Sequence, residues 1–134
     1  MDDASIGPGT GRRADPRRSL GALGEEAAAR HLAAIGYRVL GRNVRAGDVE
    51  ADIVALAPDG SVAVVEVKAR SGPWHPEDRV DAVKRDRMVR AARALSATDA
   101  FRDRMFQFDV VAVSVLAGGA IDVAHWPHAF DSPE

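Results

Sequence analysis

The sequence predicts an α/β fold in which helices flank both faces of a mixed β-sheet. Apolar periodicity gives the order α-β-β-β-α-β-β along the chain. The two central strand segments are apolar on both faces, which indicates that helices cover both sides of the sheet. The length of 134 residues fits one domain, and 46% hydrophobic with 28% charged residues is typical of a globular chain.

The composition excludes several classes of protein. The chain has no cysteine, so disulfides, cysteine-based metal sites and thiol nucleophiles are excluded. No window reaches the roughly 18 unbroken apolar residues of a membrane span, and we expect no membrane partner. The polar stretch 1–19 lacks the apolar core of a secretory signal, which favours a cytoplasmic protein.

Two segments are expected to lie outside the folded domain. Residues 1–18 are rich in Gly, Pro and Arg, which predicts a disordered basic tail. The tail is either a phosphate-contacting arm or a solvated extension. The domain itself is expected over residues 19–126, and residues 127–134 form a C-terminal tail.

The first helix is predicted over Leu20–Ile35, with Ser19 as its N-cap and Gly36 at its end. Its apolar residues share one broad face, and Glu25 lies at the border of that face. Gly24 is a poor helix former, which indicates either close packing against another element or a frayed first turn.

Three strands are predicted next. The segment 37–40 is typical of a short strand and 41–48 of an irregular link. Strands over 50–57 and 61–69 then flank Pro58-Asp59-Gly60, which fits a three-residue hairpin loop.

The length of this loop sets the register of the hairpin. With three loop residues, Asp52 lies opposite Glu66 and Glu50 opposite Lys68. Because side chains alternate between faces, all four are expected on one face of the sheet. A two-residue loop would instead place Asp52 and Glu66 on opposite faces.

The second half of the chain is predicted as loop, helix and two strands. The loop covers 70–77 and the helix 78–97. Strands over 106–116 and 120–126 follow, separated by a turn at 118–119.

The second helix is basic. Residues 79–104 hold eight basic and four acidic side chains, which is a weak indication of a polyanionic ligand. Lys84 and Arg87 fall inside its apolar stripe, where they either reach a phosphate or extend over the core. The outward arginines either contact a DNA backbone or form a solvated face. The predicted apolar stripe consists of Val80, Val83, Ala91, Ala94 and Leu95.

The hairpin carboxylates are candidate metal ligands. Opposed carboxylates such as Asp52 and Glu66 repel each other unless a cation lies between them or one is protonated. Mg²⁺ takes one or two carboxylates and keeps waters for a phosphate substrate. Lys68 could then hold the attacking water or stabilise developing charge, and Glu25 could assist. The alternative is a salt-bridged cluster without metal, in which Lys68 neutralises Glu50, Asp52 and Glu66.

Several segments together resemble the YraN family, a group of uncharacterised bacterial proteins whose fold is of the PD-(D/E)XK endonuclease type, like archaeal Holliday-junction resolvases. The resemblance covers about residues 20–116. Two positions depart from the family pattern, Val49 where Gly is usual and Gln107 where Arg is frequent. The segments that carry the resemblance are Gly24-Glu25, Gly36-Tyr37, Arg42-Asn43, Glu50-Ala51-Asp52, Val65 to Arg70, Val80 to Lys84 and Phe108-Asp109-Val110-Val111.

The resemblance implies a restriction-endonuclease-like αβββαβ core with Mg²⁺ or Mn²⁺ at Asp52 and Glu66. It implies that Lys68 is catalytic and that Glu25 assists. We therefore expect a metal-dependent endonuclease that hydrolyses phosphodiester bonds in DNA, with branched and single-stranded forms as candidate substrates. Resolvase-like proteins are often dimers, so a homodimer is one expectation. The residues expected to contact nucleic acid are Arg70, Lys84 and Arg87.

A competing hypothesis is a catalytically silent nuclease scaffold that binds nucleic acid or docks a protein. It predicts salt-sensitive binding through the 79–93 helix without metal-dependent product.

Five further positions have less specific interpretations. His125 and His128 favour a structural or tail role, because no cysteine and no other histidine lies near them in the sequence. Asp109 is expected to pair with an arginine. Trp74 and its neighbour His75 either stack on a base or cap the core.

Overall fold

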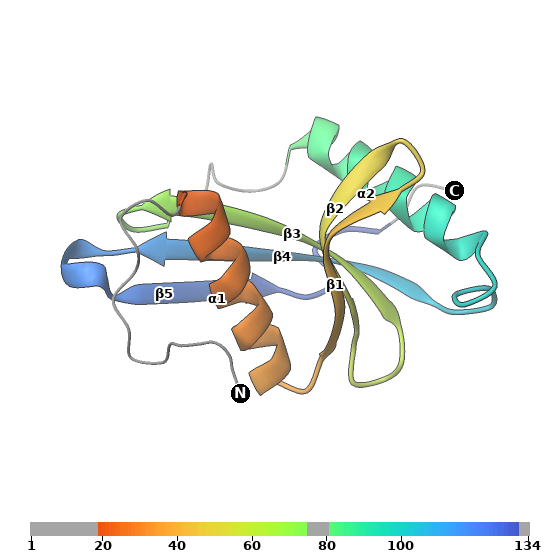
Figure 1. Cartoon of the computed structure of the whole chain (residues 1–134), viewed down its shortest axis with the longest axis horizontal. Coiled ribbons are helices and arrows are strands. Elements are labelled where there is room, and N and C mark those ends of the chain that lie inside the picture. Colours follow the sequence, from red (N-terminus) through yellow and green to blue (C-terminus); the bar gives the residue numbers. More distant parts are fainter. Residues whose placement is uncertain (1–18, 75–80, 132–134) are drawn as a thin grey trace.

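The computed structural model describes residues 19–74 and 81–131, and it confirms the predicted α/β class and element order (Figure 1). The expected N-terminal tail, His75, Val80 and residues 132–134 lie outside the described residues. The elements are α1 (Leu20–Ala34), β1 (Arg38–Ala46), β2 (Val49–Leu56), β3 (Val62–Ser71), α2 (Ala82–Ser96), β4 (Phe106–Val115), the 3₁₀ turn η2 (Ala117–Gly119) and β5 (Ile121–Trp126).

The five strands form one mixed sheet in the order β1-β2-β3-β4-β5. Only the pairing of β3 with β4 is parallel, and the chain crosses from one to the other through α2. The remaining neighbours pair antiparallel. In Figure 1, α1 crosses in front of the sheet, and α2 lies at its upper right.

A hydrophobic core fills the space on each side of the sheet. On the α1 side, Leu32 packs with Ile53 and Val65 of the central strands. On the α2 side, Val54 and Val64 pack with α2. Neighbouring residues of β2 and β3 therefore alternate between two cores, which confirms that helices cover both faces.

The first helix begins and packs as its sequence predicts. Ser19 is the N-cap, and its hydroxyl accepts a hydrogen bond from the backbone N–H of Ala22 at 3.0 Å. Gly24 lies directly over β3, where an added Cβ would come 2.6 Å from the Cβ of Ala69. This confirms close packing as the reason for a glycine within the helix.

The hairpin between β2 and β3 has the predicted three-residue loop. Gly60 adopts a φ of 91°, the left-handed conformation that a side chain disfavours. Leu56 lies opposite Val62, and Ile53 opposite Val65, as the loop length requires. The register prediction is confirmed along this ladder.

The prediction of a short strand followed by an irregular link over 41–48 is wrong. The whole segment from Arg38 to Ala46 is β1, paired along β2. Its loop-like residues are accommodated by an irregularity between Val39 and Gly41 and by Asn43 at a φ of 51°. Pairing with a buried neighbour outweighs the low strand propensity of glycine and asparagine.

Two boundaries around α2 also differ from the prediction. β3 continues to Ser71, because β4 pairs with it that far, so Arg70 lies in a strand and not in a loop. The helix begins at Ala82, after the N-cap Asp81, and not at residue 78. Val83 is 73% exposed, because burial begins only at Met88, beyond the first turn.

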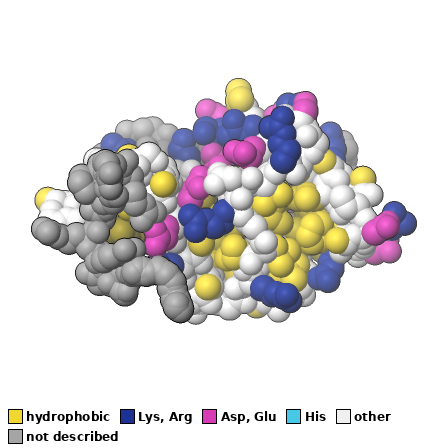
Figure 2. Space-filling model, viewed as in Figure 1, with side chains coloured by type: hydrophobic (Ala, Val, Ile, Leu, Met, Phe, Trp, Pro, Cys, Tyr) yellow, Lys and Arg dark blue, Asp and Glu magenta, His cyan; other side chains and the backbone are white. Residues whose placement is uncertain are grey.

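Figure 2 shows lysine, arginine and acidic side chains interspersed along the upper rim, where Figure 1 places α2 and the β1–β2 hairpin. Within the described part of the chain, neither helix has the length and apolarity that a membrane crossing requires.

Candidate functional site

The site lies where β2 separates from β3. The ladder between the two strands ends where Ile53 faces Val65. Beyond it the carboxylate of Asp52, through Oδ2, accepts the backbone N–H of Val67 at 2.8 Å. A side chain thus replaces the next ladder bond, and the two strands diverge from this point (Figure 1).

This divergence corrects two predicted backbone pairs. The ladder includes neither the pair Asp52–Glu66 nor the pair Glu50–Lys68. The physical reason is that β2 stays with β1, where Glu50 lies opposite Arg45, and bends toward α2. Glu50 is consequently exposed and not part of a buried four-residue cluster.

Asp52 and Glu66 nevertheless share the α2 face of the sheet. Each is two residues from a valine of the α2-side core, and alternation places the carboxylates on the same side. Glu66 Oε2 lies 3.2 Å from Lys84 Nζ, and Glu66 Oε1 lies 3.8 Å from Arg87 Nη2. The side chain of Glu66 is only 6% exposed.

The two carboxylates interact electrostatically. Burial, and then the charge of Glu66, raise the pKa of Asp52 to about 6. The Val67 N–H and the charges of Lys84 and Arg87 act in the opposite direction without cancelling these effects. A further cation at this point would favour the ionised form of Asp52.

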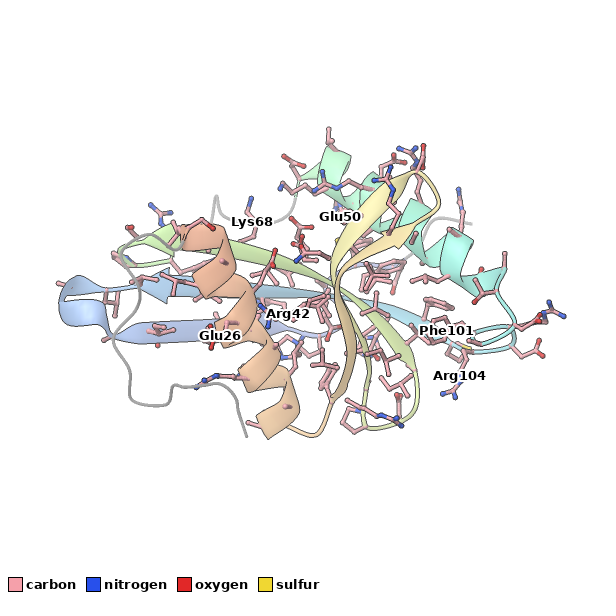
Figure 3. All side chains as sticks on the ribbon, in the orientation of Figure 1. Glu26, Arg42, Glu50, Lys68, Phe101 and Arg104 are labelled. Atoms are coloured by element: carbon pink, nitrogen blue, oxygen red, sulfur yellow. The ribbon has the colours of Figure 1, made fainter. Side chains whose placement is uncertain are left out.

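Lys68 follows Glu66 by two residues on the same strand face. It lies opposite Ala112 of β4 and is partly exposed. Figure 3 shows its side chain pointing outward at the upper side of the sheet, with Glu50 in the same region of the view. Within residues 19–74 and 81–131, Lys68 forms no ion pair, so its ammonium group is available to a ligand.

The two inward basic residues of α2 contact Glu66. The ammonium group of Lys84 and the guanidinium group of Arg87 both lie beside the buried carboxylate of Glu66. The metal-free interpretation expects Lys68 to neutralise this cluster, whereas the ion pairs of Glu66 come from α2. Arg70 continues the row of Glu66 and Lys68 along β3 and lies opposite Ser114.

Glu25 reaches the surroundings of Asp52 through an intermediate residue. Its carboxylate accepts a hydrogen bond from Asn43 Nδ2 at 3.0 Å. In the β1–β2 register, Arg42 faces Ile53 and Val44 faces Ala51, so Asn43 occupies the position opposite Asp52. The sequence alone predicts no role for Asn43. The one feature that indicates its position is that asparagine tolerates a positive φ, and Asn43 has a φ of 51°.

A second buried carboxylate, Asp109 on β4, lies on the α1 face. Its oxygens accept from the Tyr37 hydroxyl at 2.6 Å, Gln107 Nε2 at 2.9 Å, His125 Nε2 at 2.9 Å and the backbone N–H of His128 at 3.2 Å. The prediction of an arginine partner is wrong, because Tyr37, Gln107 and two histidine positions supply the hydrogen bonds of the carboxylate.

The Asp109 cluster accounts for several other residues. Gln107, a departure from the family pattern, also contacts the Tyr37 hydroxyl at 3.2 Å. His125 Nδ1 lies 3.1 Å from His31 Nε2, which supports the structural interpretation of His125. Burial opposes ionisation of Asp109, but its hydrogen bonds prevail and lower the pKa of the carboxyl.

A pocket of about 230 Å³ lies elsewhere, between the second half of α2 and the start of β4. Phe106, Phe108 and Phe130 contribute to its wall. None of the predicted site residues lines it.

Comparison with known proteins identifies the family. The model of "Uncharacterised protein family UPF0102" matches residues 24–113. A UPF0102 protein from Myxococcus xanthus is 47% identical over 126 residues, covering 90% of this chain and 98% of the relative. A UPF0102 protein from Nitratidesulfovibrio vulgaris is 41% identical over 123 residues, covering 90% of both chains. The chain belongs to the UPF0102 family, also called the YraN family.

Proposed function

We propose that Asp52, Glu66 and Lys68 form the active site of a metal-dependent endonuclease that hydrolyses phosphodiester bonds in DNA. The observation that carries the proposal is the convergence of two carboxylates and Lys68 on one sheet face, where β2 leaves β3. The resemblance to PD-(D/E)XK endonucleases described in the sequence analysis also supports the proposal.

The donor set fits Mg²⁺ or Mn²⁺. Among residues 19–74 and 81–131, no three His, Cys, Asp or Glu side chains are grouped for metal binding. Two carboxylates are sufficient for Mg²⁺, which keeps several waters in protein sites. Asp52 and Glu66 would hold the ion, which when bound polarises the phosphodiester and lowers the pKa of a bound water.

The protein side chains contribute position and charge. The Val67 N–H holds one oxygen of Asp52 and leaves the other free of that bond. Lys68 places a positive charge two residues along β3 from Glu66, where it stabilises the charge developing on the phosphate or holds the attacking water. Glu25 orients Asn43 beside Asp52.

Basic residues line the approach to this site. Lys84 and Arg87 hold Glu66, and a phosphate can draw either one away, because both remain partly exposed. Arg70 adds a charge farther along β3. These three positions are the proposed contacts to the nucleic-acid backbone.

One observation favours a second candidate function. The ion pairs of Glu66 with Lys84 and Arg87 neutralise it without metal. A silent scaffold that only binds nucleic acid would retain this arrangement.

The experiment compares wild type with Lys68→Ala on labelled DNA, in Mn²⁺ or in EDTA. The substrates are duplex, single-stranded, flapped and four-way-junction DNA, together with an RNA. Arg102→Ala is the matched control, since it removes one positive charge from an exposed residue whose ion-pair partner is the exposed Asp99. Thermal unfolding verifies that each variant folds.

We expect cleavage that requires metal and falls at least about 100-fold in Lys68→Ala, while Arg102→Ala retains it. Full activity of folded Lys68→Ala would overturn the assignment of Lys68. A metal-independent band shift without cleavage on any substrate would favour the silent scaffold.

A further inference from the structure

The chain contains two tryptophans, and the fold brings them together. Trp74 follows the end of β3, and Trp126 is the last residue of β5. Their ring centroids are 4.9 Å apart, with the ring planes inclined by 35°. Both residues are partly exposed.

Trp126 lies in register with Glu66 of the proposed active site across the intervening strand β4. Trp126 lies opposite Val110 of β4, and Val110 is the parallel partner of Glu66 on β3. The three residues therefore form one row across adjacent strands. Since neighbouring strands are about 4.8 Å apart, the backbones of Glu66 and Trp126 are separated by about 10 Å.

Trp126 points to the same face of the sheet as Glu66. Glu66 contacts Lys84 of α2, which defines the α2 face. On β5, Val123 packs into the core under α1, on the opposite face. Trp126 is three residues later, so alternation along the strand places its side chain on the α2 face.

The tryptophans cover a part of this face that α2 does not reach. Among the described elements, α2 packs mainly against β1, β2 and β3. Trp74 crosses to β5 from the loop after β3. Its indole N–H is buried and has no acceptor within residues 19–74 and 81–131. Trp74 therefore acts there through its ring and not as a hydrogen-bond donor.

Resting on the proposed nuclease function, we propose that Trp74 and Trp126 form a stacking platform for an unpaired base, which makes single-stranded DNA the substrate class of this site. Lys68 and Arg70 lie on the same face, on the strand that carries Glu66. They provide phosphate contacts beside the platform, and aromatic stacking with basic residues along the backbone is the usual combination in single-strand binding.

The stacking of the bases determines whether a tryptophan ring can bind them, and it differs between duplex and single-stranded DNA. In a duplex, both faces of each base are stacked on neighbours, so a ring platform gains access only to an unstacked base. A separation of about 10 Å spans at most about three nucleotides, because 3.4 Å is the rise per nucleotide of stacked DNA and an unstacked strand is more extended. A strand whose phosphate reaches Glu66 can therefore place a nearby base on the tryptophans.

Binding is measured in EDTA on the Lys68→Ala background, which separates it from cleavage. The probes are a fluorescein-labelled oligothymidylate and a blunt duplex, followed by anisotropy and by quenching of the intrinsic tryptophan fluorescence. We expect Trp74→Ala to weaken oligothymidylate binding about 10-fold and duplex binding less than about twofold. Trp74→Phe retains most of the affinity, since it keeps an aromatic face.

Phe101→Leu is the control, because Phe101 lies at the far end of the molecule from Lys68 (Figure 3). Equal oligothymidylate binding by Trp74→Ala and its parent, or equal losses for both probes, would overturn the platform. If Trp74→Ala does not fold, Trp74→Phe and Trp126→Phe take its place. In that case, the proposal is overturned if bound oligothymidylate does not quench the tryptophan fluorescence of the parent protein.

Failure of the platform and failure of the nuclease are distinguishable. Selective oligothymidylate binding without cleavage by wild type would retain the platform and reject the nuclease. Lys68-dependent cleavage whose ratio between single strand and duplex is unchanged in Trp74→Ala would retain the nuclease and reject the platform.

Discussion

Two carboxylate clusters lie on opposite faces of the same sheet, and the pKa values of their aspartates are shifted in opposite directions. Asp109 is fully buried and accepts four hydrogen bonds, which lower its pKa despite burial. Asp52 accepts one backbone N–H, and burial with the adjacent Glu66 raises its pKa to about 6.

The comparison teaches that burial alone does not mark a functional carboxylate. Asp109 is the more deeply buried group, but its surroundings satisfy it, which is typical of a structural role. Asp52 remains short of compensating positive charge, and such a residue is a candidate for binding a cation. Removing the charge of Asp109 and removing the charge of Asp52 should therefore have opposite effects on the free energy of unfolding.

The largest effect is expected from Asp109→Ala. The change removes the acceptor of the Tyr37 hydroxyl and of His125 Nε2 and leaves Gln107 Nε2 with the Tyr37 hydroxyl, and we expect a loss of about 3–5 kcal/mol in the free energy of unfolding. Urea denaturation measures it. Asp99→Ala is the control, because Asp99 is 94% exposed and should change stability by less than about 0.5 kcal/mol. A loss below about 1 kcal/mol for Asp109→Ala would contradict the structural role.

A smaller loss is expected from Lys84→Met. The methionine keeps the apolar stem but leaves Glu66 with only the longer contact to Arg87, which should lower the free energy of unfolding by about 1–3 kcal/mol. Mg²⁺ should restore part of this loss, because the ion replaces the missing charge. Arg93→Met, from the exposed side of α2, serves as the control. If Mg²⁺ stabilises both variants equally, Glu66 does not hold the ion.

The smallest effect has the opposite sign. The folded protein binds the Asp52 proton more tightly than an unfolded chain, whose pKa is near 3.8, so this contribution is full below pH 3.8 and is lost as the pH rises through about 6. Asp52→Asn keeps an acceptor for the Val67 N–H and removes the charge. We expect it to raise the free energy of unfolding by about 1–2 kcal/mol at pH 8.

The pH dependence sharpens this prediction. The gain in Asp52→Asn should shrink at pH 5, where wild type is largely protonated at Asp52. Burial and then His125 lower the pKa of His31, so both proteins should share a loss of stability as the pH falls below 6.5. Unfolding at pH 8, 6.5 and 5 measures both trends, and destabilisation by Asp52→Asn at pH 8 would contradict the comparison.

The sequence predicts the features that depend on local chemistry. Pro58-Asp59-Gly60 determines the loop length, and the loop length determines which hairpin residues share a face. Ser19 predicts the start of α1 in the same way. These inferences needed no knowledge of distant contacts.

The features that sequence reasoning missed depend on contacts between distant segments. The full length of β1 follows from its pairing with β2, which overrides the loop-like Gly41 and Asn43. The end of the β2–β3 ladder depends on a side chain, Asp52, replacing a backbone acceptor. The partners of Asp109 come from three separate parts of the chain, so no local pattern indicates them.

The span of the Asp109 cluster has a consequence for synthesis of the protein. Its hydrogen bonds join Tyr37, just after the first helix, to His125 and His128 near the end of the described chain. A nascent chain that still lacks β5 leaves Asp109 buried without two of its donors. We therefore expect the Asp109 cluster to form only after residues 121–128 have left the ribosome.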